Sequence, residues 1–224
     1  MREIVLDTET TGFRQNDGDR IVEIGCIELV NHVATGNNYH QYINPERDMP
    51  DEAFGVHGLS EEFLSDFPVM ADVMEAFLEF IGDDTPLVIH NAEFDMRFIN
   101  AELGHLGLET LPMSRSIDTV RMAREKFPGA PASLDALCRR FEIDNTSRTL
   151  HGALLDAELL AEVYLELIGG RQPGLGLAGP SRAQAATGSG PRETKQPRDH
   201  APDSAELEAH AKFVESLDNP LWRS

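Results

Sequence analysis

The stretch Ile4-Val5-Leu6-Asp7-Thr8-Glu9-Thr10-Thr11-Gly12 decides the fold of this chain. Its apolar start predicts a buried strand, with two carboxylates at the carboxyl end. Because side chains alternate along a strand, Asp7 and Glu9 project from the same face. Two acids side by side near a core repel each other, and a divalent cation would remove that cost. The alternative is a pair of solvated acids at an ordinary strand end. A metal site is favoured only if further acids of the chain converge on this pair.

The composition bounds what such a site can serve. The chain has 224 residues, 41% of them hydrophobic, which suits one domain with an additional segment. Its formal net charge of −20 and pI near 4.6 have the wrong sign for holding nucleic acid through the overall field. A nucleic-acid substrate would have to be bound locally, and processive binding would need a partner protein.

Neither the cysteines nor the N-terminus indicates export or a membrane. Only Cys26 and Cys138 are present, without a second cysteine or a histidine at zinc-finger spacing, so a disulfide framework is not expected. The chain enters a strand at once, without a signal-peptide pattern, and no apolar run approaches the ~20 residues of a membrane span. We therefore expect a cytoplasmic protein.

The order of the predicted elements favours an α/β domain with a mixed sheet. Strands are predicted over residues 20–30 and 33–43, which would form an antiparallel meander with the first strand, and over 86–90. Residues 52–59 are predicted to be irregular. Apolar spacing predicts the main helices over residues 72–81, 91–104, 117–126, 133–141 and 152–168.

The composition changes after Ile168. Residues 170–200 are rich in Gly, Pro, Ser and Ala and predict a flexible linker after a domain over residues 1–169. Within residues 201–224, Asp203 and Glu206 fit a capping box that opens a helix with an apolar stripe. A helix this short is marginal alone, so we expect it to dock on a partner. The alternative is that it folds back on the domain.

A third acid falls close to the first two. Asp95 lies four residues after Asn91, the expected N-cap of helix 91–104, so both share a helix face. They follow the carboxyl end of strand 86–90, where ligands of α/β sheets bind, so Asp95 could meet Asp7 and Glu9. The alternative is an acid favoured only by the helix dipole.

His151 and Asp156 form the next candidate pair. Five residues apart, they would lie about 140° apart within one helix and could not share a face. If His151 precedes the helix and Asp156 occupies its first turns, both can reach one site. The alternatives are a surface-loop histidine and another acid at a helix start.

Together, these positions suit hydrolysis of a phosphodiester with two metal ions. Carboxylate oxygens are preferred ligands of Mg²⁺ and Mn²⁺. Two such ions ~4 Å apart can bind opposite sides of a phosphate. Histidine titrates near neutral pH and can serve as the general base on the attacking water.

The same residues carry a resemblance to a known family. Asp7-Thr-Glu9-Thr-Thr-Gly12, Asn91-Ala-Glu-Phe-Asp95 and His151-x4-Asp156 resemble, in order, the three motifs of the DnaQ-like (DEDDh) 3′→5′ exonucleases, over residues 2 to about 169. The segment Glu52-Ala-Phe-Gly-Val-His57-Gly-Leu is most similar to that of the branch formed by the proofreading ε subunits of bacterial DNA polymerase III.

The resemblance implies a ribonuclease H-like fold with a five-stranded mixed sheet flanked by helices, and a role for each site residue. Two Mg²⁺ or Mn²⁺ ions would be held by Asp7, Glu9, Asp95 and Asp156, with Asp7 bridging the two and His151 as general base. The terminal nucleotide would contact the metal ligands Asp7, Glu9 and Asp156 together with Thr8, Thr10, Glu52 and His57, and the pocket wall would include Phe54 and Val56.

The resemblance also implies partners. Residues 201–224 would bind the polymerase α subunit, and Gln172–Leu177 looks like a sliding-clamp-binding peptide without its usual terminal aromatic residue. A small θ subunit binds some relatives. The implied activity is proofreading of mispaired DNA 3′ termini. Two alternatives stay open: an RNA-trimming enzyme of the RNase T or oligoribonuclease kind, and a non-catalytic scaffold for the polymerase.

Overall fold

The protein is described by a computed structural model, which covers residues 1–146, 150–170 and 202–216. Its strands form one sheet in the order β3-β2-β1-β4-β5. β1 pairs antiparallel with β2, as does β2 with β3, whereas β4 pairs parallel with β1 and β5. The expected five-stranded mixed sheet is therefore confirmed. The strands are β1 Arg2–Thr10, β2 Ile21–Val30, β3 Val33–Tyr42, β4 Leu87–Ile89 and β5 Ser116–Asp118.

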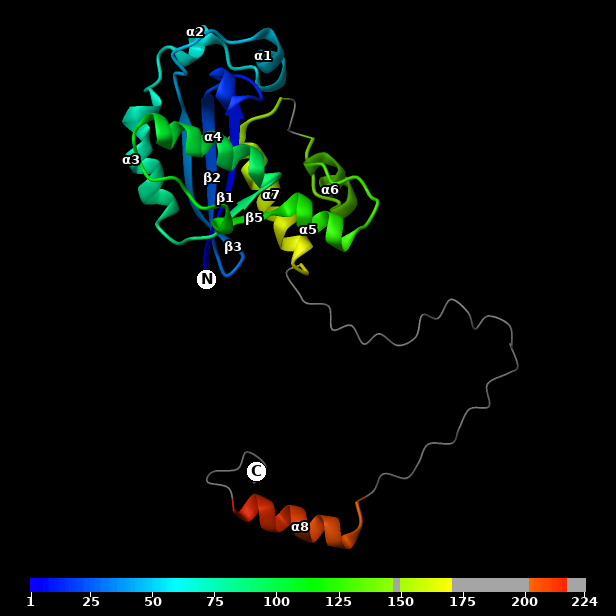
Figure 1. The fold of residues 1–224 in the computed structure, drawn as a ribbon. Coiled ribbons are helices and arrows are strands. Elements are labelled where there is room, and N and C mark those ends of the chain that lie inside the picture. Colours follow the sequence, from blue (N-terminus) through cyan, green and yellow to red (C-terminus); the bar gives the residue numbers. More distant parts are fainter. Residues whose placement is uncertain (147–149, 171–201, 217–224) are drawn as a thin grey trace, which may run out of the picture. The chain divides into compact units, whose positions relative to one another are not determined.

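Helices cover both faces of the sheet (Figure 1). α3 and α4 pack on one face, and α5, α6 and α7 on the other. The helices are α1 Asp51–His57, α2 Glu61–Leu64, α3 Met70–Ile81, α4 Ala92–His105, α5 Thr119–Lys126, α6 Leu134–Phe141, α7 Ala153–Leu167 and α8 Ser204–Glu215, with the short 3-10 turns η1 Gln15–Asp17 and η2 Met113–Arg115.

Two predictions of local structure are wrong. Residues 52–59 are not irregular, because α1 occupies Asp51–His57, closed by Gly58 in the left-handed region at φ 72°. Helix 117–126 starts too early, because Ile117 pairs with Val88 in the sheet. The helix begins only at Thr119, where the side chain of Asp118 accepts from two backbone N–H groups as the N-cap.

The alternation of side chains along β1 assigns its acids to one layer. Ile4 and Leu6 belong to the core under α3 and α4, whereas Val5 belongs to the core under α7. Glu3, Asp7 and Glu9 have the same parity as Val5, so they face the α7 side of the sheet.

At the amino end of β1, a buried acid is held by protein groups. Glu3 is 1% exposed. The Tyr164 hydroxyl of α7 donates to Glu3 Oε1 at 2.6 Å, and His32 Nδ1 lies 2.7 Å from Oε2. Burial, with the Glu3 contact, raises the pKa of Tyr164, so the phenol stays a neutral donor.

The carboxyl end of α7 is fixed by a lysine of α5. Lys126 Nζ donates to the carbonyls of Glu166 and Leu167 at 3.0 and 2.8 Å. A cation at a helix C-terminus also opposes the negative end of the helix dipole. Across the described parts of the chain, no helix is long and apolar enough to cross a membrane.

The chain divides into two units, Met1–Gly176 and Leu177–Ser224. In the second unit, α8 begins with the expected capping box, in which Asp203 accepts from the backbone and Glu206 accepts in return. Leu207 and Phe213 are 56% and 61% exposed. The predicted linker beyond Gly170, the peptide Gln172–Leu177 and the final residues 217–224 lie outside the described residues.

Candidate active site

The site begins on β1, where Asp7 and Glu9 face the α7 layer. Asp7 pairs with Gly25 of β2, and Glu9 with Glu23. A side chain at Gly25 would meet the backbone of Ala153 and Leu154, with an added Cβ only 2.3 Å from the Ala153 carbonyl carbon. Gly25 thus allows the first turn of α7 to approach the sheet directly opposite Asp7. Sequence reasoning missed this residue, although a lone glycine in an apolar strand is a signal of close backbone approach.

His151 and Asp156 enter the site from the start of α7. His151 precedes the helix and Asp156 lies in its first turn, so the geometry required by their spacing is present. The backbone N–H of His151 donates to the Val56 carbonyl of α1 at 3.1 Å, and His151 Nδ1 lies 3.3 Å from Asp156 Oδ2. Ligand atoms of Glu9, His151 and Asp156 lie within 4.8 Å of one another.

Asp95 approaches from the opposite layer, on the first turn of α4. The hydroxyl of Thr8 on β1 donates to Asp95 Oδ1 at 2.7 Å, which fixes the carboxyl group at the sheet edge. Asp95 is 3% exposed, and burial raises its pKa to about 7 although the Thr8 hydrogen bond lowers it. Asn91, at the expected N-cap, takes the left-handed conformation at φ 67° and makes no side-chain cap bond.

All four predicted carboxylates and His151 line a single cavity of about 290 Å³. We call it the acidic cavity. β1, α4, α7 and the start of α6 contribute to it. No lysine or arginine occurs among the described residues that line this cavity. The lining residues are Asp7, Thr8, Glu9, His90, Phe94, Asp95, Ser133, Leu134, Asp135, His151 and Asp156.

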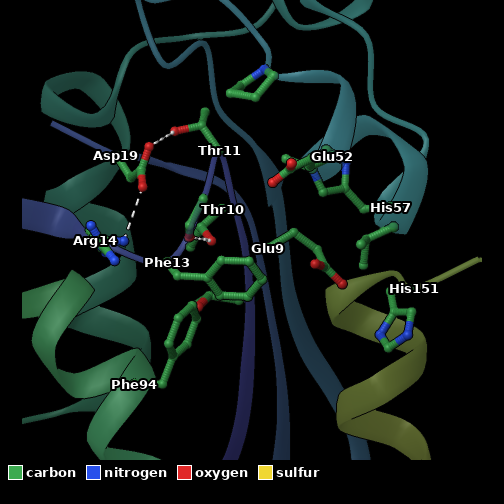
Figure 2. A pocket seen from close by; sticks show the side chains of 15 residues that line it. Glu9, Thr10, Thr11, Phe13, Arg14, Asp19, Glu52, His57, Phe94 and His151 are labelled. Atoms are coloured by element: carbon green, nitrogen blue, oxygen red, sulfur yellow. Dashed lines mark hydrogen bonds between the residues drawn. The ribbon is translucent and has the colours of Figure 1, made fainter. Parts of the chain in front are cut away.

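A second, larger cavity of about 550 Å³ adjoins the first and shares Thr8, Glu9, Phe94 and His151 with it. In Figure 2 the Glu9 carboxylate points toward His151. The predicted nucleotide contacts Thr8, Thr10, Glu52 and His57 all line this cavity, as does Val56, whereas Phe54 does not. The full lining is Thr8, Glu9, Thr10, Thr11, Gly12, Phe13, Arg14, Asp19, Pro50, Glu52, Ala53, Val56, His57, Phe94 and His151.

His57 presents a buried hydrogen-bond donor to this larger cavity. Its Nδ1 accepts from the Leu59 backbone N–H at 3.0 Å, so Nε2 carries the proton of the neutral ring. Burial is the main cause that lowers the pKa of His57, and the nearby His151 lowers it further. The Thr10 carbonyl opposes this shift but does not accept a complete hydrogen bond, and Nε2 has no partner among the described residues. A bound ligand oxygen could accept from it.

Two further features of the larger cavity escaped sequence reasoning. Phe13 is 74% exposed and packs edge-on against Phe94, with ring centroids 6.4 Å apart. The loop that carries Phe13 is fixed by Asp19, whose carboxylate accepts from the Arg14 backbone N–H and the Thr11 hydroxyl (Figure 2). The exposed phenylalanine directly after the Thr-Thr-Gly turn was the available signal.

The residues present fit a divalent metal site. Asp95 is nearly fully buried, and its raised pKa shows that the protein environment alone disfavours its charged form. The donors that converge are carboxylate oxygens with one histidine, which suit hard or borderline divalent cations. A cation in the acidic cavity would favour the ionised carboxyl groups.

Comparison with known proteins identifies the class. A family model described as "Exonuclease" matches residues 4–164, which is most of the chain. The chain therefore belongs to the exonuclease family, and the predicted resemblance is confirmed.

Within this family, the chain groups with proteins named DNA polymerase III subunit epsilon. It is 51% identical to that of Rickettsia felis over 97% of both chains. It is 58% identical to that of Rickettsia prowazekii, over 77% of this chain and 76% of the relative. The Escherichia coli relative is 51% identical, over 76% of this chain and 72% of the relative.

Solved structures agree with the family assignment. The chain is 26% identical to exonuclease X, solved in complex with 5′ overhanging duplex DNA, with a TM-score of 0.59 over 74% of this chain and 90% of that chain. The nuclease domain of 3′hExo, described as a DEDDh family member bound to rAMP, has a TM-score of 0.64 at 17% identity, over 75% and 91%. This second likeness supports the ribonuclease H-like fold alone.

Proposed function

We propose that this chain removes nucleotides from mispaired DNA 3′ termini as the proofreading subunit of a bacterial replicative polymerase. The observation that carries the proposal is the convergence of Asp7, Glu9, Asp95, Asp156 and His151 on one cavity, in a chain whose relatives are named DNA polymerase III subunit epsilon. A mismatched end is the preferred substrate because it frays into single strand at lower cost than a paired end.

The four carboxylates would hold two divalent cations, Mg²⁺ or Mn²⁺. When bound, such cations supply positive charge that stabilises the negative charge on the phosphate in the transition state. Asp7 lines the same cavity as Glu9, Asp95 and Asp156, and the family resemblance implies that it would help to hold both ions. Glu9 and Asp156 would serve one position jointly with His151 nearby, as their ligand atoms lie within 4.8 Å of one another.

His151 would act as the general base. Its Nδ1 faces the Asp156 carboxylate at 3.3 Å, so Nε2 is the nitrogen placed to accept a proton from the attacking water. The backbone hydrogen bond to Val56 holds the histidine in front of the cavity.

The larger cavity would take the terminal nucleotide. His57 Nε2 would donate to an oxygen of that nucleotide, and Glu52 would accept from one of its hydroxyl groups. The aromatic pair of Phe13 and Phe94 would supply a stacking surface for a base, a contact that tolerates any sequence. Thr8 and Thr10 would contribute backbone groups, because their hydroxyls already donate to Asp95 and to the Gly12 carbonyl.

The partners belong to the same proposal. Residues 201–224 would bind the polymerase α subunit, for which the exposed Leu207 and Phe213 of α8 supply apolar contacts. The peptide Gln172–Leu177 would bind the sliding clamp, a θ subunit would bind the exonuclease domain, and the complex would act in the cytoplasm. Holding of the DNA by polymerase and clamp is consistent with the net charge of −20.

The relatives do not favour the two alternatives. An RNA-trimming exonuclease would share this site but would prefer RNA 3′ ends, and a scaffold would hydrolyse neither. In the test, the purified chain is given 5′-labelled single-stranded DNA, RNA of the same sequence, and duplexes with paired or mispaired 3′ ends, in Mg²⁺ or Mn²⁺. We expect distributive shortening of single-stranded DNA and of mispaired ends, with Asp156→Asn inactive.

Three results would contradict the proposal. Faster shortening of RNA than DNA would favour the trimming enzyme. Absence of hydrolysis by the wild type with either metal would favour the scaffold. Activity that survives in Asp156→Asn would show that the site is elsewhere. Co-purification with a polymerase, with and without residues 201–224, tests the partner.

A further inference from the structure

Within the described part of residues 1–170, the distribution of cations singles out α5 and α6. Residues 119–141 carry five lysines and arginines against two acids, a net charge of +3, whereas the whole chain carries −20. Arg124, Arg139 and Arg140 are all exposed. Within residues 1–170, this segment is therefore a basic region on an otherwise acidic domain.

Most described cations are already engaged. Arginines elsewhere pair with an acid or donate to backbone carbonyls, as Arg20 does with Glu102 at 2.8 Å and Arg115 with the Gly82 carbonyl at 2.7 Å. Among the described residues, only Arg124, Arg139 and Arg140 lack an acidic or carbonyl partner. Arg140 instead stacks over the Phe127 ring, 4.4 Å from its centroid, which holds the guanidinium in place and leaves its N–H donors available.

α6 carries Arg139 and Arg140 in its last turn and reaches the acidic cavity at its start. Ser133, Leu134 and Asp135 at its start line the acidic cavity. Arg139 and Arg140, in its last turn, line a shallow open hollow with other residues of the same segment. At 1.5 Å per residue, they lie only about 6–8 Å further along the helix axis than Asp135.

The arrangement of the two cavities indicates the path that a bound nucleic-acid strand would follow. If the terminal nucleotide occupies the larger cavity and the scissile phosphate lies at the shared residues Glu9 and His151, the rest of the strand leaves through the acidic cavity, past the start of α6. Phosphates of that strand carry one negative charge per nucleotide, and arginine is suited to bind them.

We propose that Arg139 and Arg140 bind the phosphate backbone of the nucleic acid upstream of its terminal nucleotide. The inference rests on the proposed exonuclease function and adds a binding surface outside the two cavities. These arginines hold the strand and take no part in the chemistry, so they should act on the affinity for long substrates only.

A pair of substrates separates binding of the strand from chemistry. The p-nitrophenyl ester of thymidine 5′-monophosphate offers a terminal nucleotide without upstream phosphates, and a 20-nucleotide single-stranded DNA offers many. In the full chain with Mn²⁺, Arg139→Glu should raise KM for the oligonucleotide by up to roughly fivefold, and Arg139→Glu/Arg140→Glu by more. The kcat for both substrates, and KM for the ester, should stay at the wild-type value.

Salt dependence gives a second readout. The slope of log KM against log salt concentration for the oligonucleotide should decrease by roughly 0.7 for each phosphate contact removed. Arg97→Glu on α4 is the matched control, because Arg97 is half-exposed and only 3.8 Å from Glu93. Arg139→Glu alone keeps the Arg140–Phe127 contact, so a normal melting temperature for this variant excludes misfolding.

Distinct outcomes overturn the inference and the function. If the variants hydrolyse ester and oligonucleotide with wild-type KM, the exonuclease stands and the phosphate surface is wrong. The same holds if Arg97→Glu raises KM for the oligonucleotide as much as Arg139→Glu does, since the effect would then come from net charge alone. If the wild type hydrolyses neither substrate, the proposed function fails, and this inference fails with it.

Discussion

At the amino end of β1, Glu3 faces Tyr164 of α7, and at the carboxyl end Asp7 and Glu9 face Asp156 of the same helix. Both ends bury carboxyl groups between the same strand and helix. At the first end a neutral hydroxyl donates to the acid, and at the second several acids line one cavity. An acid that accepts a hydrogen bond from a protein donor stabilises the fold, whereas acids gathered around one space suit a bound cation.

The two ends also differ in how closely the helix approaches the strand. Asp7 pairs with Gly25, where α7 comes within contact of the sheet backbone. Glu3 pairs with Leu29, and the side chain of Leu29 belongs to the core that includes side chains of α7. The end with the proposed catalytic residues is therefore held by a close backbone approach, and the other end by a side-chain hydrogen bond.

The largest expected effect is a loss of activity at the end with Asp7 and Glu9, without a loss of stability. Asp7→Ala should lower kcat on single-stranded DNA by on the order of 10³-fold or more, because it removes an electrostatic group that would act directly on the transition state. The free energy of unfolding, measured in chelator by denaturant titration, should not fall, since a repulsive acid is lost. A variant that unfolds as it loses activity would mean that Asp7 is structural, as Glu3 is.

The next effect changes the distance between helix and strand. Gly25→Ala places a Cβ 2.3 Å from the backbone of α7, so the helix start has to move. Overpacking should cost about 1–3 kcal/mol of stability, and displacement of His151 and Asp156 should lower kcat by about 10²-fold.

The matched control for Gly25→Ala is Gly104→Ala in α4, where an added Cβ meets nothing within 4 Å. This variant should keep its activity and gain roughly 0.5–1 kcal/mol, because alanine favours a helix over glycine. Wild-type kcat in Gly25→Ala would show that the close approach does not position the site.

A reciprocal change at the other end should affect stability alone. Glu3→Ala leaves the buried Tyr164 hydroxyl without its acceptor, so the free energy of unfolding should fall by about 1–3 kcal/mol. The kcat of the folded fraction should equal that of the wild type. Tyr164→Phe removes the same bond from its donor, and the double variant should lose less than the sum of the two. Additive losses would contradict a shared interaction.

The smallest expected effect is a gain of stability when Asp95, which lines the acidic cavity, is replaced. Because burial raises the pKa of Asp95 to about 7 from its ordinary 3.8, the folded protein in chelator binds a proton that the unfolded chain releases. Stability should therefore be full below pH 4 and decline as the pH rises toward 7. Asp95→Asn should abolish this decline and gain about 1–2 kcal/mol at pH 8, less than the pKa difference alone allows, because the new amide needs acceptors.

That prediction has a direct check. Thermal unfolding in chelator is followed from pH 4 to 8 for the wild type and Asp95→Asn, together with the nuclease activity of each in Mn²⁺. The variant should be inactive although it is more stable. A wild-type profile without the decline, or with the same decline in Asp95→Asn, would mean that Asp95 is not destabilised by its burial.

Much of this site could be predicted from periodicity, because its geometry is local. The two-residue spacing of Asp7 and Glu9 places both toward α7, and the five-residue spacing of His151 and Asp156 requires the histidine to precede the helix, as it does. The order of strands and helices similarly predicted a mixed sheet.

What could not be predicted depends on tertiary contact. The neutral donor of His57 follows from burial and from the Leu59 N–H, neither of which has a sequence pattern. Helix α1 was missed because Gly55 and Val56 are weak helix formers, and its acidic start and Gly58 cap outweigh them. β5 has only three residues, and the apolar spacing of this segment also fits a helix. Its pairing with β4 therefore could not be predicted from the sequence.

Lys126 gives the molecule a mechanical property. A pull exerted on the chain beyond Gly170 would enter α7 at its carboxyl end, next to the carbonyls that Lys126 binds. α7 has 15 residues, so this anchor lies about 22 Å from the helix start, next to which the proposed catalytic side chains lie. Such a pull would load α5 and the carboxyl end of α7 first, so an exonuclease towed by a moving polymerase would keep its proposed active site unstrained.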